Sequence, residues 1–269
     1  MCYIHDRNIK DCLCITSEAA NLLHKKSYGG IFALKIDISK AFDTLEWSFS
    51  LKVLKIFGFN EVFCRWILVI MQSVFLSVSI NGTSHGYFNC TRGVRQGDPL
   101  SPLLFCLAGD VLSRSISKLV LDGKEERIKG TRNSFLPSHS FHADDLMIYC
   151  KGRSSIIIAL TDIFNRYALS SGQIINTNKS SIFSSSISQS RLAQIVDLLH
   201  FNIGSLPFNY LGFPVFKGKP KVCHLQPITD KIKLMLSNWK VSLLSMVGRV
   251  QLVRFVILSM LTYNISIYS

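Results

Sequence analysis

Two short apolar segments that each lead to an aspartate constrain the fold most strongly. The run at 31–36 ends at Asp37, which predicts a buried strand that finishes on a carboxylate. Apolar residues on both sides of Asp144 and Asp145, within 141–148, predict a tight hairpin with both carboxylates at its turn. An Asp-Asp pair alone more often marks a solvated turn. The combination, however, would bring three carboxylates together on adjacent strands, as magnesium-dependent phosphoryl transfer requires.

Periodicity and turn residues predict further elements along the chain. We expect a helix from Lys40 to Gly58, a hairpin at 75–89 turning at Asn81-Gly82, a helix capped by Ser101 before Pro102, a helix at 154–171 closed by Gly172, a hairpin at Tyr210–Phe216, and two helices within 225–268. Strands and helices interleave around an antiparallel hairpin. This order favours an α+β fold, an antiparallel sheet backed by helices.

The charge balance favours a polyanionic partner. The chain has 30 Lys and Arg against 17 Asp and Glu, a net charge of +13. Nucleic acid is the most common partner of such a basic protein, although a basic enzyme without a nucleic-acid partner is also compatible with this balance. Only 17% of residues are charged, below the typical share of about 25%. We therefore expect part of the apolar surface to pack against another segment or partner.

Cysteine usage and hydropathy indicate an intracellular protein. The eight cysteines lack the spacing of a zinc site or a C-x-x-C motif, which predicts reduced thiols in the cytoplasm or nucleus. The sequence shows no secretory signal. Its most apolar stretch, 255–268, is shorter than the roughly 20 residues that span a bilayer, so we expect no membrane partner.

Three segments resemble motifs A, B and C of the reverse transcriptases of LINE-type (non-LTR) retrotransposons. They are Lys35-Ile36-Asp37-Ile38-Ser39-Lys40-Ala41-Phe42-Asp43, Arg95-Gln96-Gly97-Asp98-Pro99-Leu100-Ser101-Pro102 and Phe141-His142-Ala143-Asp144-Asp145. Later segments at 171–180, 210–220 and 237–252 resemble motif D, the primer-grip region of plant LINE elements and the sequence that follows it. The resemblance covers nearly the whole chain.

The resemblance implies a right-hand polymerase palm with partial fingers and a partial helical thumb. Residues 1–30 would be a remnant of the fingers and 31–205 the palm with motifs A to D. Residues 206–224 would form a primer-grip-like hairpin, and 225–269 a partial helical thumb or connection. The implied activity is RNA-directed DNA polymerisation by a plant LINE element. Its partners would be an RNA template, a DNA primer and deoxynucleoside triphosphates.

The resemblance also implies roles for individual residues. Asp37, Asp144 and Asp145 would hold two Mg²⁺ ions, and Lys179 would reach the leaving pyrophosphate as a general acid or electrostatic clamp. Phe42 would crowd a 2′-hydroxyl and so select deoxynucleotides. The remaining candidates are Arg7, Arg95, Gln96 and Gly97 for nucleotide and template, Tyr210, Leu211 and Gly212 for the primer grip, and Lys217, Lys219, Lys221, Lys231 and Lys233 for duplex phosphates.

The sequence departs from the family pattern at one motif position and at its ends. His142 stands where the family usually has Phe or Tyr, so we expect weaker primer extension with the metal ligands intact. The preceding fingers motifs, an endonuclease domain and an RNase H domain are not found. A truncated, inactive retroelement remnant with at most weak nucleic-acid binding is therefore the alternative. A maturase-like splicing factor would require an organelle-targeting presequence, which is not evident.

Overall fold

The computed structural model describes residues 8–25, 27, 29–130, 134–238 and 244–265. Its helices are α1 (Ile9–Leu22), α2 (Trp47–Ile56), α3 (Glu61–Gln72), α4 (Ser101–Leu121), α5 (Ser154–Ser171), α6 (Gln189–Leu199), α7 (Val222–Asn238), α8 (Met246–Leu252) and α9 (Leu258–Ile265), the last two joined by a π-helical segment (Val253–Ile257). Its strands are β1 (Ile31–Asp37), β2 (Phe75–Ile80), β3 (Thr83–Asn89), β4 (His139–His142), β5 (Asp145–Lys151), β6 (Ser181–Ser184), β7 (Asn202–Ile203), β8 (Phe208–Tyr210) and β9 (Phe213–Val215).

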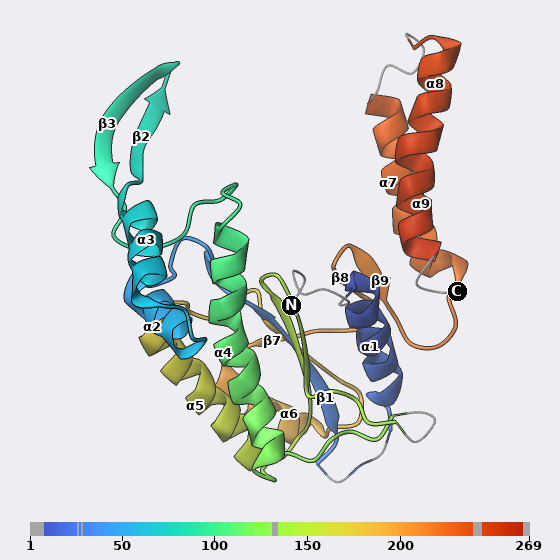
Figure 1. The fold of residues 1–269 in the computed structure, drawn as a ribbon. Coiled ribbons are helices and arrows are strands. Elements are labelled where there is room, and N and C mark those ends of the chain that lie inside the picture. Colours follow the sequence, from blue (N-terminus) through green and yellow to red (C-terminus); the bar gives the residue numbers. More distant parts are fainter. Residues whose placement is uncertain (1–7, 26, 28, 131–133, 239–243, 266–269) are drawn as a thin grey trace.

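A five-stranded sheet in the order β4-β5-β1-β6-β7 forms the centre of the molecule (Figure 1). Its pairs are antiparallel except β6 with β7, so the predicted α+β fold is confirmed. Successive side chains of β1 enter two cores. Phe32, Leu34 and Ile36 pack with helices α2 to α6, whereas Ile31 and Ala33 pack with α1 and the β8–β9 hairpin. Burial on both faces explains why the first four residues of the strand are all apolar.

The helix predicted from Lys40 begins only at Trp47. Lys40 has a left-handed backbone (φ 45°), and the segment after it forms turns. The carbonyl of Phe42 accepts from the amide of Val94, and that of Leu45 accepts from Gly93, at 2.7 and 2.8 Å. These bonds to a distant loop replace the first helical turn, and local periodicity could not reveal them. The N-cap of α4 is Leu100 rather than the predicted Ser101.

Helices α1, α3 and α6 and strand β7 were not predicted from the sequence. The outer face of α3 explains why its pattern was obscure, because Val62, Trp66, Val69 and Ile70 are exposed apolar residues. The β2–β3 hairpin that follows also exposes large apolar side chains and projects away from the sheet (Figure 1). This is the uncovered apolar surface that the low charge content predicted.

The predicted turns and caps formed where glycine and asparagine indicated. Asn81 and Gly82 both have positive φ, as a two-residue hairpin turn requires. Gly172 closes α5 with φ 74°. The β8–β9 hairpin begins at Phe208, two residues before the predicted start at Tyr210. It turns at Leu211 and Gly212, which both have positive φ.

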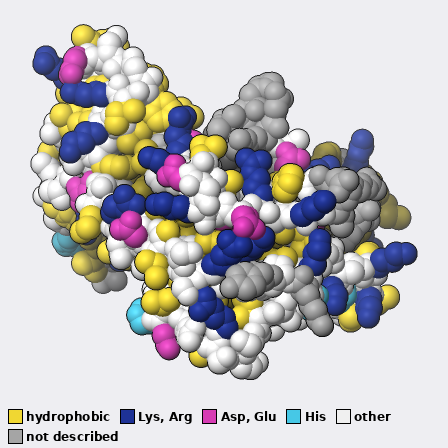
Figure 2. Space-filling model, turned by 90° about the horizontal axis from the view of Figure 1, so that it is seen from below, with side chains coloured by type: hydrophobic (Ala, Val, Ile, Leu, Met, Phe, Trp, Pro, Cys, Tyr) yellow, Lys and Arg dark blue, Asp and Glu magenta, His cyan; other side chains and the backbone are white. Residues whose placement is uncertain are grey.

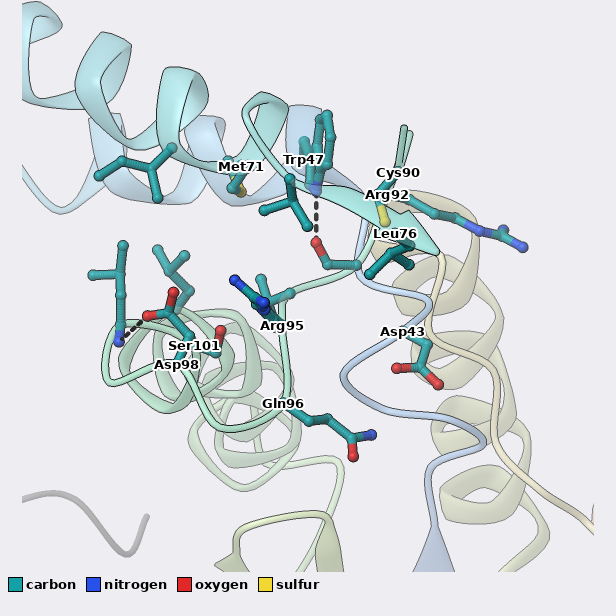
Figure 3. A pocket seen from close by; sticks show the side chains of 16 residues that line it. Asp43, Trp47, Met71, Leu76, Cys90, Arg92, Arg95, Gln96, Asp98 and Ser101 are labelled. Atoms are coloured by element: carbon teal, nitrogen blue, oxygen red, sulfur yellow. Dashed lines mark hydrogen bonds between the residues drawn. The ribbon is translucent and has the colours of Figure 1, made fainter. Parts of the chain in front are cut away.

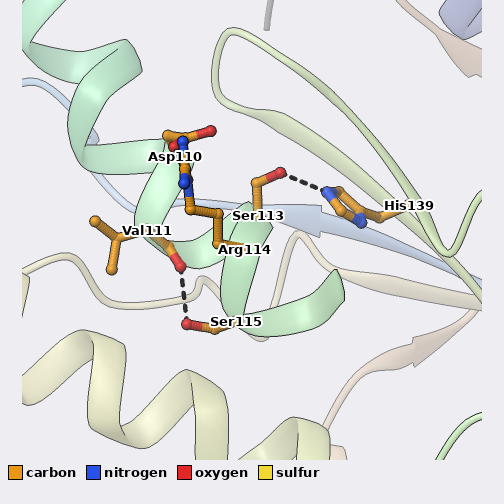
Figure 4. Close-up of polar contacts among 6 residues, drawn as sticks. All are labelled: Asp110, Val111, Ser113, Arg114, Ser115 and His139. Atoms are coloured by element: carbon orange, nitrogen blue, oxygen red, sulfur yellow. Dashed lines mark hydrogen bonds and ion pairs between the residues drawn. The ribbon is translucent and has the colours of Figure 1, made fainter. Parts of the chain in front are cut away.

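Helix α4 runs beside the sheet and is linked to its edge strand by a polar contact. The Ser113 hydroxyl and Nε2 of His139 on β4 are 2.7 Å apart (Figure 4). On the outer side of the same helix, Arg114 forms an ion pair with Asp110. The contact to His139 fixes α4 against the strand that leads to the Asp144 turn.

The C-terminal helices stand beside the β8–β9 hairpin, farther from the sheet (Figure 1). Lys and Arg side chains are spread over the face seen from below, with Asp and Glu side chains interspersed among them (Figure 2). Among the residues with described positions, no helix is both long and apolar enough to cross a membrane.

Candidate active site

Two of the three predicted metal ligands face each other across adjacent strands. Asp37, the last residue of β1, lies directly opposite Asp145, the first residue of β5. His142 of β4 is opposite Asp145 on the other side. Directly opposed residues point to the same face of a sheet, with β-carbons about 5 Å apart. The sheet therefore presents His142, Asp145 and Asp37 as one row, which we call the carboxylate row.

The turn between β4 and β5 carries the third carboxylate. Ala143 has φ 51°, a conformation that costs a non-glycine residue about 1 kcal/mol. This geometry reverses the chain within two residues and leaves Asp144 exposed at the tip. Asp144 is thus next to the row and open to a ligand from solvent.

Burial and the neighbouring charges act together on Asp145. Burial raises the pKa of Asp145, and the charges of Asp144 and Asp37 act in the same direction, whereas Lys35 lowers it. Burial also lowers the pKa of His142, so its imidazole is neutral at pH 7. A cation bound here would relieve the repulsion among the carboxylates.

The segment that includes Lys179 is bonded to the end of β1. The Ser180 hydroxyl accepts a hydrogen bond from the amide of Asp37 at 3.2 Å, and the amide of Asn176 donates to the Asp37 carbonyl at 2.9 Å. Lys179, one residue before Ser180, is exposed. The fold therefore brings Lys179 to the same end of the sheet as the carboxylate row.

Phe42 lies on the loop after β1 rather than on the predicted helix. Its ring stacks on Phe105 of α4 with centroids 4.9 Å apart. Gln173, which is 1% exposed, supports the loop by donating from Nε2 to the Ala41 carbonyl at 2.6 Å, and it accepts from the Tyr167 hydroxyl at 2.5 Å. These contacts hold Phe42 in one place.

Arg95 and Gln96 line a cavity of about 460 Å³ beside this loop, and Gly97 follows them in the chain (Figure 3). The walls are largely apolar and include Trp47, whose indole nitrogen donates to the Gly93 carbonyl at 2.6 Å. None of the three carboxylates lines this cavity. Gly97 has φ 89°, so a side chain there would be strained.

The primer-grip candidates occupy different environments. Tyr210 is fully buried against the sheet, whereas Leu211 and Gly212 form the turn of the hairpin. Of these three residues, only Leu211 and Gly212 at the turn are accessible to a ligand. Lys217, Lys219, Lys221, Lys231 and Lys233 are all exposed on α7 and the segment before it. Arg7 lies outside the described residues.

In the described part of the chain, no three His, Cys, Asp or Glu side chains converge closely enough to hold an ion. Mg²⁺ commonly takes one or two carboxylates and completes its shell with water and substrate phosphates. Asp37 and Asp145, opposed on neighbouring strands with Asp144 beside them, fit that donor set.

Sequence reasoning assigned no role to Lys35 or Gln173. Lys35 is the one charged residue within the apolar run before Asp37, and strand alternation places it on the same face as Asp37. A charged residue within an apolar run was the sequence signal that could have indicated a role for Lys35. No such signal marks Gln173, because the Ala41 carbonyl that it contacts is distant in sequence.

Comparison with known proteins identifies the family. Residues 3–215 match the family described as reverse transcriptase (RNA-dependent DNA polymerase). The chain is 28% identical over 135 residues to the polyprotein of the type-2 retrotransposable element R2DM of Drosophila melanogaster, covering 50% of this chain and 12% of that protein. It is 32% identical over 79 residues to the type-1 element R2 polyprotein of Popillia japonica, covering 29% of this chain and 13% of that protein.

Two further similarities concern a plant protein and the fold. An uncharacterised mitochondrial protein of Arabidopsis thaliana is 41% identical over 71 residues, which is 26% of this chain and 58% of that protein. The solved structure of Candida albicans telomerase with a telomeric RNA fragment superposes with a TM-score of 0.53 at 16% identity, covering 85% of this chain and 39% of that chain. It supports the palm-like fold. The family match spans most of the chain and includes Asp37, His142 and Asp145 of the carboxylate row. This chain therefore belongs to the reverse transcriptase family.

Proposed function

We propose that this chain is the catalytic part of an RNA-directed DNA polymerase of a non-LTR retrotransposon. The observation that carries the proposal is the pairing of Asp37 with Asp145 across adjacent strands, with Asp144 at the intervening turn, in a chain of the reverse transcriptase family. Similarity to the R2 polyproteins supports the non-LTR type. The 41% identity to the Arabidopsis protein supports a plant origin.

In this proposal the three carboxylates hold two Mg²⁺ ions. The chemistry that Mg²⁺ supplies when bound is ionisation of the primer 3′-hydroxyl and neutralisation of the leaving pyrophosphate. Asp37 and Asp145 fix the position of the reacting groups, because each is held by strand pairing rather than by a loop. Asp144, exposed at the turn, would supply the third carboxylate.

The remaining groups orient the substrates. Phe42, held by its stack on Phe105, would limit space at the sugar and exclude a 2′-hydroxyl. Lys179 would donate charge or a proton to the pyrophosphate. Arg95 and Gln96 would contact the nucleotide and the template. An RNA template, a DNA primer and deoxynucleoside triphosphates are the substrates in this scheme.

The test is extension of a labelled DNA primer on an RNA template by the purified chain with Mg²⁺. We expect extension by the wild type and loss of more than about 10³-fold in Asp37→Asn and Asp145→Asn, because each removes a charge at the reacting phosphate. Asp162→Asn, on the exposed side of α5, is the matched control and should retain activity. Equal extension by all four proteins would disprove the assignment.

A second candidate is a nucleic-acid-binding protein without polymerase activity. His142 favours it, because a neutral imidazole replaces the larger aromatic ring usual at that position. Binding would then depend on the exposed lysines after β9 and on α7. A folded wild type that binds primer–template with strong salt dependence, yet extends no primer, would support this candidate over the first.

A further inference from the structure

The β8–β9 hairpin is too small to hold its own position. Each of its strands has three residues, and an isolated two-stranded hairpin is marginal in water. Its apolar side chains pack on the sheet: Phe208 stacks on Phe183 of β6, and Tyr210 and Phe213 are buried. Apolar burial is not directional. A directional polar contact would add a defined register between the hairpin and β1 to this apolar packing.

Lys35 supplies a directional contact between this hairpin and β1. Its Nζ donates a hydrogen bond to the Asn209 carbonyl of β8 at 3.1 Å. Lys35 precedes Asp37 by two residues on the same strand, so both side chains leave the same face. A side chain on the same sheet face as the carboxylate row therefore contacts the hairpin directly.

The hairpin leaves the Asn209 carbonyl available for this bond. Tyr210 and Phe213 close the two-residue turn, so they form a hydrogen-bonded pair, and the next pair, Asn209 with Pro214, does not. The backbone groups of Asn209 consequently point away from β9. Proline is tolerated opposite it, because no amide donor is needed there.

We propose that Lys35 is a positioning residue that fixes the β8–β9 hairpin relative to the carboxylate row. This inference rests on the proposed function: if the turn of the hairpin supports the primer, Lys35 sets the distance between the primer terminus and Asp37. Methionine at this position would keep the apolar stem and lose the donor. Arginine would keep a donor and the charge.

Two measurements on the full chain test the proposal. One tests the contact between Lys35 and the Asn209 carbonyl, which we call the tether, and the other tests its effect on primer extension. Hydrogen exchange of the backbone amides within 208–215, Pro214 excepted, reports this contact without requiring activity. We expect about tenfold faster exchange in Lys35→Met, from the loss of a charge-assisted hydrogen bond, and near wild-type exchange in Lys35→Arg. Lys52→Met, an exposed lysine of α2, is the matched control and should leave the hairpin unchanged.

Single-turnover primer extension at saturating Mg²⁺ reports the consequence. We expect Lys35→Met to slow extension about 10- to 100-fold, because a displaced primer end leaves the reactive geometry, while the primer–template Kd changes less than about threefold. Lys35→Arg should recover most of the rate. A purely structural role would instead lower the thermal midpoint and weaken primer binding together with the rate.

The two readouts separate the possible failures. Unchanged hairpin exchange in Lys35→Met would overturn the tether, whatever the extension rate. Faster exchange with an unchanged rate would overturn the positioning role. A wild type that cannot extend any primer would remove the proposed function and with it the catalytic consequence, whereas hairpin exchange would still support or overturn the structural contact.

Discussion

Glu125 predicts a pH-dependent loss of stability that can be measured directly. It follows α4 and is only 4% exposed, and its Oε2 has no hydrogen-bond partner among the described residues. Burial raises the pKa of Glu125 from 4.5 to about 7. Its charge also acts on the buried thiol of Cys150 on β5. The folded chain therefore favours the protonated carboxyl.

The sign and the magnitude follow from proton linkage. Below pH 4.5 the side chain is protonated in both states, so the favourable contribution of the neutral group is fully present. As the pH rises from 4.5 to about 7, the side chain loses its proton in the unfolded state but keeps it in the folded state, so the stability falls across this range. The difference between 4.5 and about 7, at about 1.4 kcal/mol per pH unit, corresponds to about 3 kcal/mol. That is a large part of a typical stability of about 5–15 kcal/mol.

Glu125→Gln removes the titration and keeps the shape of the side chain. We expect similar free energies of unfolding at pH 4 and a variant that is more stable by up to about 3 kcal/mol at pH 8, measured by urea denaturation across this range. Glu126→Gln is the matched control. The exposed Glu126 pairs with Lys151 and Arg153, which lower its pKa, so its replacement should not stabilise the chain at pH 8. Parallel stability curves for wild type and Glu125→Gln would refute the reasoning.

Three further substitutions test the contacts that hold the segment after β1 beside the candidate active site. Gln173→Leu leaves two buried polar groups unpaired and should lower the free energy of unfolding by about 2 kcal/mol, checked by urea denaturation. Phe42→Val should raise incorporation of ribonucleotides relative to deoxynucleotides in primer extension, and an unchanged ratio would refute its steric role. Gly93→Ala should cost at least about 2 kcal/mol, because φ is 84° and the new β-carbon would lie 2.6 Å from the Asp43 carbonyl oxygen. Gly123→Ala, with positive φ but open space around it, should cost less in the same measurement.

The sequence by itself determined the features that depend on neighbouring residues. The apolar run ending at Asp37, the hairpin around Asp144 and Asp145, the Asn81-Gly82 turn and the Gly172 cap all formed near their predicted positions. Each rests on local rules: strand burial, the need for positive φ in tight turns, and the left-handed end of a helix. These rules were enough to place Asp37 at the end of a strand and Asp144 and Asp145 at a hairpin turn, whereas the pairing of β1 with β5 came from the tertiary structure.

Only the tertiary structure decided the features that depend on distant partners. Helix α2 begins late because the carbonyls of Phe42 and Leu45 bond to the loop at 93–94. Lys35 donates a hydrogen bond to the carbonyl of Asn209, which is distant in sequence. Burial raises the pKa of Glu125, and no local pattern reveals that burial. The free energy of these contacts comes from pairs that only the folded chain brings together. The sequence therefore located the carboxylates, and the fold determined which residues hold them in position.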